Sequence, residues 1–246
     1  MRQTMGAPSL RSPIVEHSVP TPSLTRIELT ERFDTRSRWA LVVARSTDED
    51  AVSACFVKGS AADRKGEVIA KTCGGHEVSP FPAGARPFHR LLKSEIVFAR
   101  PDGQAPLLLL QACTPRYGNG SCWVSTLLYA YDREADAFRT VFFGLTGSDR
   151  RQETRFVESG PLLGRVIVAT PTPDGPAAYF IEVYKRTTVG EYVRVLKYRS
   201  APRYLDDATP SVIDSEMSEV LRRLVQSPRI DAHSALASCV TSGAAR

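Results

Sequence analysis

The chain has 246 residues and a formal net charge of +5 at pH 7, with 42% apolar and 24% charged residues. This balance is typical of a soluble globular protein, and no apolar stretch approaches the roughly 18 residues of a membrane-spanning helix. The basic residues are scattered among 27 acidic ones, which argues against a nucleic-acid-binding surface. We therefore expect a globular protein without a membrane span and without a nucleic-acid partner.

The first 23 residues contain four prolines among serines and threonines, a composition typical of a linker or a disordered arm. They include neither the apolar core nor the small-residue cleavage site of a signal peptide. Two interpretations stay open at this point: a cytoplasmic protein, or an exported protein whose leader is not part of this sequence.

A first series of apolar segments follows, and we predict that its members are strands. These segments cover residues 25–29, 39–44, 52–57 and 67–71. A connector rich in glycine and proline comes next, over residues 74–87.

Residues 95–199 contain an internal repeat, in which one antiparallel β unit occurs twice. Similar residues recur 58 positions apart in the first half of the unit, as in Glu95 and Glu153 or Leu109 and Ile167. In the final hairpin the interval is 54: Leu127 with Ile181, Phe138 with Tyr192, Val141 with Val195. We predict four antiparallel strands in each copy, over about residues 94–148 and 149–200. The first series of segments is an open candidate for a third copy, although its spacing fits neither interval.

The strands of the repeat are apolar on both sides more often than simple alternation allows. Residues 138–143 and 192–198 place large apolar side chains on each face of the predicted sheets. A sheet with one face in water shows clean alternation, so these sheets are expected to pack face to face. The sequence thus predicts an all-β protein of tandem four-stranded antiparallel units, propeller-like or a sandwich.

One helix is predicted at the carboxyl end, over residues 215–226, with Asp214 or Ser215 as its N-cap. Its apolar residues form one stripe at helical spacing: Met217, Val220, Leu221, Leu224 and Val225. The helix completes an all-β domain over residues 24–226, and residues 227–246 are expected to form a disordered tail.

The cysteines are Cys55, Cys73, Cys113, Cys122 and Cys239, and none belongs to a CxxC motif. Because histidines are also few, zinc-ligand spacing is missing. Cys113 and Cys122 bracket a polar loop between two predicted strands, which favours a disulfide. Cys55 and Cys73 could form a second one, although the connectivity is open. A disulfide indicates an oxidising compartment, so a periplasmic or secreted protein is preferred over a cytoplasmic one.

No motif in the sequence indicates a cofactor, a metal ion or a catalytic residue. Nucleotide-binding glycine motifs and nucleophile elbows are missing. Asp132, Glu134 and Asp136 alternate as in the first half of a calcium loop. That loop also needs a glycine and a closing glutamate, and Ala137 and Phe143 stand in those places. We therefore interpret the three carboxylates as a solvated hairpin turn.

Glu95 and Glu153 occupy equivalent positions in the two copies, and Glu158 and Glu182 also lie near predicted strands. A pair of carboxylates across a cleft is what glycoside hydrolysis requires. A glycan-acting hydrolase is therefore an alternative, although charged residues at strand ends are more often simply solvated.

The loop that the predicted disulfide closes is the best candidate for a recognition site. It carries Arg116, Tyr117 and Asn119, and Trp123 follows it. Tyr and Arg side chains are frequent in binding hot spots, and a disulfide lowers the entropy lost on binding. We expect a protein or an envelope glycan to bind these residues.

Two runs of residues carry a resemblance to other proteins. One contains Cys122-Trp-Val-Ser-Thr and Tyr129-Ala-Tyr-Asp132, and the other contains Tyr198-Arg-Ser and Ile213-Asp-Ser-Glu-Met217. Together they resemble uncharacterised bacterial exported proteins built from degenerate propeller-like β repeats, over roughly residues 90–225. The resemblance implies export and a repeated β fold, and it assigns no functional residues.

The sequence as a whole favours a non-enzymatic, extracytoplasmic binding protein of unknown ligand. A glycan-acting hydrolase and a purely structural or assembly module are the alternatives. Convergent acidic or histidine side chains in one pocket would favour the hydrolase.

Overall fold

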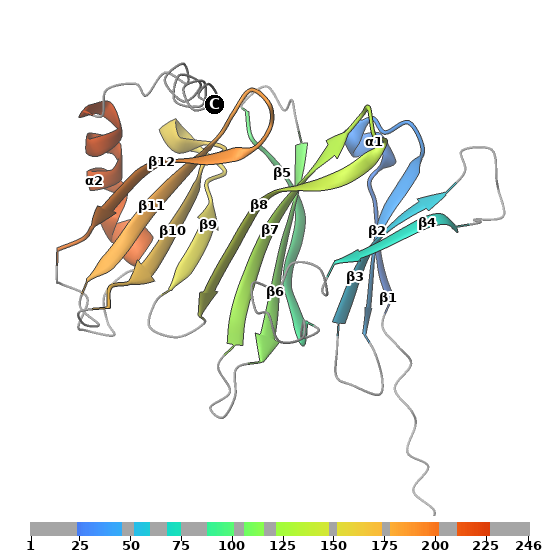
Figure 1. Ribbon diagram of the computed structural model, residues 1–246, viewed down its shortest axis with the longest axis horizontal. Helices are drawn as coiled ribbons and strands as arrows, with labels where there is room; N and C mark the ends of the chain where they lie inside the picture. The colour runs from blue at the N-terminus through green and yellow to red at the C-terminus, as the bar shows by residue number, and fades with distance from the viewer. Residues whose placement is uncertain are drawn as a thin grey trace, which may run out of the picture.

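The computed structural model describes residues 24–45, 52–59, 68–74, 88–100, 106–115, 122–147, 152–173, 178–201 and 211–226. Within these ranges twelve strands form three four-stranded antiparallel sheets (Figure 1). In each sheet the strands pair in the order in which they follow one another along the chain. The prediction of an all-β protein with tandem four-stranded units is confirmed. The predicted arm, the connector beyond Gly74 and the predicted tail lie outside the described residues.

Sheet 1 contains β1 (Leu24–Glu28), β2 (Arg38–Arg45), β3 (Val52–Gly59) and β4 (Val68–Gly74), with a short helix α1 (Thr30–Phe33) between the first two. Sheet 2 contains β5 (Arg90–Phe98), β6 (Pro106–Pro115), β7 (Cys122–Asp132) and β8 (Ala137–Gly147). Sheet 3 contains β9 (Glu153–Phe156), β10 (Val166–Pro171), β11 (Tyr179–Arg186) and β12 (Tyr192–Arg199), with a 3₁₀ turn η1 (Gly160–Leu162) after β9. The first series of apolar segments therefore forms a third four-stranded unit.

The middle sheet, sheet 2, is buried on both faces. In β6, Leu108 and Leu110 face sheet 1, whereas Leu107 and Leu109 face sheet 3, and all four are at most 2% exposed. Successive side chains of a strand point to opposite faces, so a continuous apolar run is what a strand between two covers requires. Sheet 3 is covered in turn on its outer face by α2 (Val212–Gln226), as Figure 1 shows.

Aromatic side chains form the centre of the contact between sheets 1 and 2. Phe138 of β8 stacks on Phe56 of β3, with ring centroids 4.8 Å apart. The rings of Phe33 and Trp39 meet Phe138 edge to face at 5.0 and 5.6 Å. Aromatic pairs of this geometry contribute about 0.5–1.5 kcal/mol beyond the area they bury, so this cluster helps to fix how the first two sheets pack.

The predicted repeat is present, with one correction to its spacing. The interval of 58 places Leu109 and Ile167 on equivalent faces, each toward the next layer of the structure. The interval of 54 likewise preserves the faces of β8 and β12. For β7 and β11 it is wrong, because it matches Leu127, which faces sheet 1, with Ile181, which faces α2.

The interval that preserves the faces of β7 and β11 is 55. Each strand has one irregularity in its hairpin pairing, between Leu128 and Tyr129 in sheet 2 and between Val183 and Tyr184 in sheet 3. A shift of one residue exchanges the two faces of a strand. Where both faces are apolar, residue type alone does not reveal that shift.

Helix α2 begins at Val212, three residues before the predicted start. The Ser211 hydroxyl donates to Oδ2 of Asp214 at 2.7 Å and accepts the backbone N–H of Asp214 at 3.2 Å. Ser211 is therefore the N-cap. The predicted caps, Asp214 and Ser215, are wrong because both lie inside the helix. None of the helices in the described ranges is long and apolar enough to cross a membrane.

The buried face of α2 matches the predicted stripe only in part. Val220 is fully buried, but Val225 is 86% exposed and does not contribute. Three residues outside the prediction complete the buried face: Val212, Ile213 and Glu216. An oxygen of Glu216 accepts a hydrogen bond from the Tyr198 hydroxyl at 2.8 Å, which compensates the carboxylate for part of its lost hydration.

We predict that Ile213→Ala destabilises the protein by about 2–4 kcal/mol, the usual cost of truncating a buried aliphatic side chain. Val225→Ala removes two methyl groups from the exposed side of the same helix and should change the unfolding free energy by less than about 0.5 kcal/mol. Urea denaturation of both variants measures the difference. Equal effects would mean that α2 does not depend on its contact with sheet 3.

Candidate functional site

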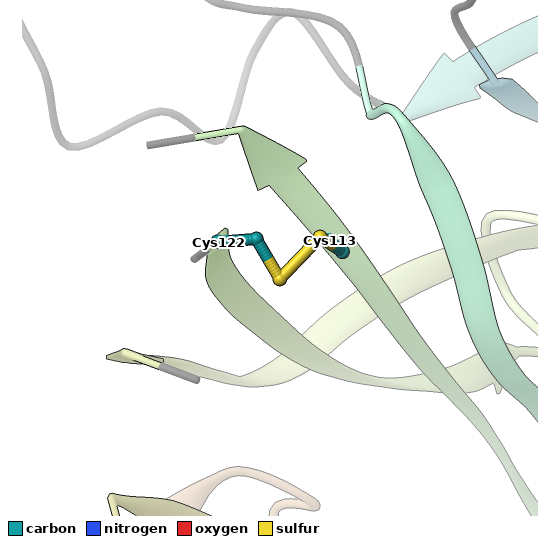
Figure 2. The surroundings of a disulfide bond; sticks show 2 residues. All are labelled: Cys113 and Cys122. Atoms are coloured by element: carbon teal, nitrogen blue, oxygen red, sulfur yellow. A yellow bond between two sulfur atoms is a disulfide. The ribbon is translucent and has the colours of Figure 1, made fainter. Parts of the chain in front are cut away.

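The predicted disulfide between Cys113 and Cys122 is confirmed. It joins the end of β6 to the start of β7 (Figure 2), with Cα atoms 5.6 Å apart. Of the predicted recognition residues, Arg116, Tyr117 and Asn119 lie outside the described residues. Trp123 is partly buried on β7, where its Cα partners are in β6 and β8.

Cys55 and Cys73 are Cα partners in the pairing of β3 with β4. Cys55 is buried, whereas the side chain of Cys73 is not among those described. The register agrees with the suggested second disulfide, which stays a prediction.

The turn between β7 and β8 differs from the predicted solvated turn at one residue, Asp136. Asp132 behaves as predicted: its Oδ1 accepts the backbone N–H groups of Glu134 and Ala135 at 3.0 and 3.1 Å. The side chain of Asp136, by contrast, is only 15% exposed and lies 2.7 Å from Nζ of Lys58. The backbone of Asp136 is left-handed, with φ 44°.

Three further donors bind the Asp136 carboxylate. The hydroxyls of Ser37 and Tyr131 donate at 2.6 and 2.7 Å, and the Trp39 indole N–H donates at 3.1 Å. Burial acts to raise the pKa of Asp136, but the hydrogen bonds from Lys58 and the other donors outweigh it and hold that pKa well below its ordinary value. Asp136 therefore links sheet 1 to sheet 2 and has a structural role.

Three of the four carboxylates considered for hydrolysis are held in contacts of the same kind. Oε1 of Glu153 accepts the backbone N–H of Ile213 at 2.8 Å, and its Oε2 lies 3.3 Å from Arg155. Glu95 forms an ion pair with Lys93. Glu182 lies 2.9–3.0 Å from two cationic side chains of β12. These contacts favour structural roles for all three carboxylates.

A cavity of about 470 Å³ lies where sheet 2, the first strand of sheet 3 and α2 meet. One wall is apolar and includes Leu109 of β6, Leu162 of η1, and Met217 and Leu221 of α2. Because these side chains come from three elements, the cavity depends on how α2 and the two sheets pack together.

The other side of the cavity is polar. Lys93 of β5 and Gln111 of β6 line it from sheet 2, and Glu158 lines it from the segment after β9. The Glu95 carboxylate, followed by the Glu158 carboxylate, raises the pKa of Lys93 against the opposing effect of burial. Gln111 is held in place, because its side-chain nitrogen donates to the Thr126 hydroxyl at 3.1 Å and to a carbonyl oxygen of β9 at 3.3 Å.

The turn after β9 forms part of the cavity wall. β9 pairs with β10 over four residues, and the chain then leaves the sheet through η1, whose Leu162 lines the cavity. A Cβ atom at Gly164 would lie 2.2 Å from the carbonyl oxygen of Ala99, and the φ of Gly164 is +75°. Glycine is therefore required where this turn presses against the end of β5.

Sequence reasoning named Glu158 only as a charge near a strand, and it did not identify the cavity. The length of the segment after β9 gave no signal, because the interval of 58 between the two copies is the same before and after it. Comparison with known proteins gave no match to any family model, curated protein or solved structure. The resemblance noted in the sequence therefore stays a prediction.

We predict that Asp136→Asn destabilises the protein by about 1–3 kcal/mol at pH 7, because partly buried donors lose a charged acceptor. The folded-state pKa of Asp136 lies below its ordinary value of 3.8. Its contribution is therefore present above that value and is lost as the pH falls through the folded-state pKa. Urea denaturation should show a constant difference from wild type between about pH 7 and pH 5, and a shrinking one below about pH 4.

Glu134→Gln is the matched control, since it neutralises an exposed carboxylate in the same turn. Asparagine tolerates the left-handed backbone of position 136, so the variant tests the carboxylate and not the turn. A difference from wild type that does not change down to about pH 3 would contradict the assignment.

Proposed function

We propose that the protein is a non-enzymatic, extracytoplasmic binding protein that holds its ligand in the cavity between sheets 2 and 3. The cavity is the observation that carries the proposal. Its volume of about 470 Å³ lies within the range of small-molecule sites, about 300–1,000 Å³. Such sites combine apolar side chains with polar groups that orient the ligand, and this cavity has both.

The contacts of the carboxylates support binding over hydrolysis. Retaining and inverting glycosidases need one carboxyl group that donates a proton and a second one that acts as nucleophile or base. Glu153 already accepts an N–H of α2 and pairs with Arg155, and Glu95 pairs with Lys93. Release of either carboxylate for catalysis would break a contact that holds the cavity wall.

The disulfide supports the extracytoplasmic part of the proposal, because disulfides persist mainly in oxidising compartments. It also lies two residues beyond Gln111 on β6, so it restrains the strand that supplies part of the cavity wall. The loop that carries Arg116, Tyr117 and Asn119 stays our predicted contact for a protein or an envelope glycan.

The binding proposal predicts that a neutral amphipathic dye, N-phenyl-1-naphthylamine, binds the full chain at one saturable site, with increased fluorescence. Leu221→Trp places a large ring on the apolar wall and should abolish this binding. Val225→Trp adds the same ring to the exposed side of α2 and should leave it unchanged.

Both variants should unfold within about 1 kcal/mol of wild type, so that any loss of dye binding reports on the cavity. Absence of saturable binding to the wild type would overturn the proposal. Equal binding by the Leu221→Trp variant would do the same, because the dye would then bind elsewhere.

The localisation can be tested in cells that express the full-length protein. Free thiols are blocked with an alkylating reagent at lysis, and the cysteine-containing peptides are then analysed by mass spectrometry without reduction. We expect Cys113 and Cys122 to be joined and unmodified. Alkylation of both residues in the native host would contradict an oxidising compartment.

A further inference from the structure

We infer that the ligand of this cavity is a small amphipathic cation, namely a protonated amine carried on an apolar body. This inference rests on the proposed function, because it names the class of ligand for the same cavity. Three features of the walls support it: the pairing of their cationic side chains, the chemistry of their polar groups and the position of their apolar side chains.

Both cationic side chains that line the cavity are already paired with carboxylates. Each has two ion-pair partners: Glu95 and Glu158 for Lys93, Glu153 and Asp214 for Arg155. Of these four carboxylates, Glu158 itself lines the cavity, so it is the charged group of the wall that can receive a ligand's cation.

Glu158 is the carboxylate best placed to receive a cationic group. It is 56% exposed, and its contact with Lys93 is 3.4 Å long, longer than the 2.7–2.9 Å of a strong charge-assisted hydrogen bond. Glu153, in contrast, is held by the backbone of α2 and by Arg155. An ammonium group can therefore bind Glu158 without breaking a contact between strands.

Gln111 adds a second acceptor to the polar side. Its nitrogen makes both of its donor contacts inside the protein, with the Thr126 hydroxyl and the Thr154 carbonyl oxygen. The amide oxygen is then the group that Gln111 can offer to a ligand. Glu158 and Gln111 are both acceptors, which suits a ligand whose polar group donates hydrogen bonds.

The apolar wall accounts for the body of the ligand. Leu109 and Leu162 are nearly fully buried, and Met217 and Leu221 are partly buried beside them. Methionine side chains are flexible and fit ligands of different shapes. An alkyl or aryl group along this wall would bury the apolar surface that Met217 and Leu221 leave in contact with solvent.

The test compares three ligands that share one apolar body: n-octylammonium, octanoate and 1-octanol. Each is titrated into the full chain with bound N-phenyl-1-naphthylamine, and displacement of the dye is measured. We expect n-octylammonium to displace the dye at the lowest concentration and octanoate at the highest. Added NaCl should weaken the binding of n-octylammonium and leave the binding of 1-octanol unchanged, because salt screens only the charged contact.

Glu158→Gln should weaken the affinity for n-octylammonium about two- to fivefold, the size expected for one partly exposed ion pair. It should not change the affinity for 1-octanol. The matched control is Glu134→Gln, which neutralises an exposed carboxylate in the β7–β8 turn and should affect neither ligand.

The outcomes separate this inference from the proposed function. If the dye binds and octanoate or 1-octanol displaces it as well as n-octylammonium, the cavity is a binding site and the inferred ligand class is wrong. The same conclusion follows if Glu158→Gln and Glu134→Gln behave alike. If the dye does not bind the wild type, the proposed function itself fails.

Discussion

The burial of sheet 2 on both faces is the constraint on which the other layers depend. A sheet whose strands are apolar on each side must be covered on both faces. A leucine contributes about 1.5–3 kcal/mol to the stability of the fold only when its face is covered. Sheet 1 covers one face and sheet 3 the other. Sheet 3 then has an apolar outer face of its own, which α2 covers. The stack of layers ends at α2, because a helix buries one apolar stripe and can present polar residues on its opposite side.

Apolar contact between sheets is not directional, so it does not by itself determine how one sheet is placed over the next. The hydrogen bonds of Asp136 are directional and restrict how sheets 1 and 2 are placed. Its carboxylate binds Ser37 and Trp39, which precede it by 99 and 97 residues, and these bonds form in only one arrangement of sheets 1 and 2. Buried polar networks help to specify a single packing where every member has a partner. The Asp136 network therefore complements the aromatic cluster around Phe138.

The sequence predicted the features that depend on residues close together in the chain. Strand pairs, the repeated unit and the Cys113–Cys122 disulfide all follow from local patterns and short loops. The errors concern contacts between distant segments. Asp136 resembled its exposed neighbours because its partners lie in another sheet, and the interval between β7 and β11 was wrong by one because both faces of those strands are buried. Ser211 was missed as the N-cap because Val212 and Ile213 look like the end of a loop until their burial against sheet 3 is known.

The cavity is lined by the turn that follows β9. The last residues of β5 and β9, Phe98 and Phe156, are equivalent at the interval of 58, and after Phe156 the chain leaves the sheet through η1. This turn is held in place: Gly164 packs against Ala99, and the Tyr192 hydroxyl donates to the Gly164 carbonyl oxygen at 2.8 Å. A cavity formed by a fixed turn needs little rearrangement to receive a ligand, so less of the binding free energy is lost to ordering the site.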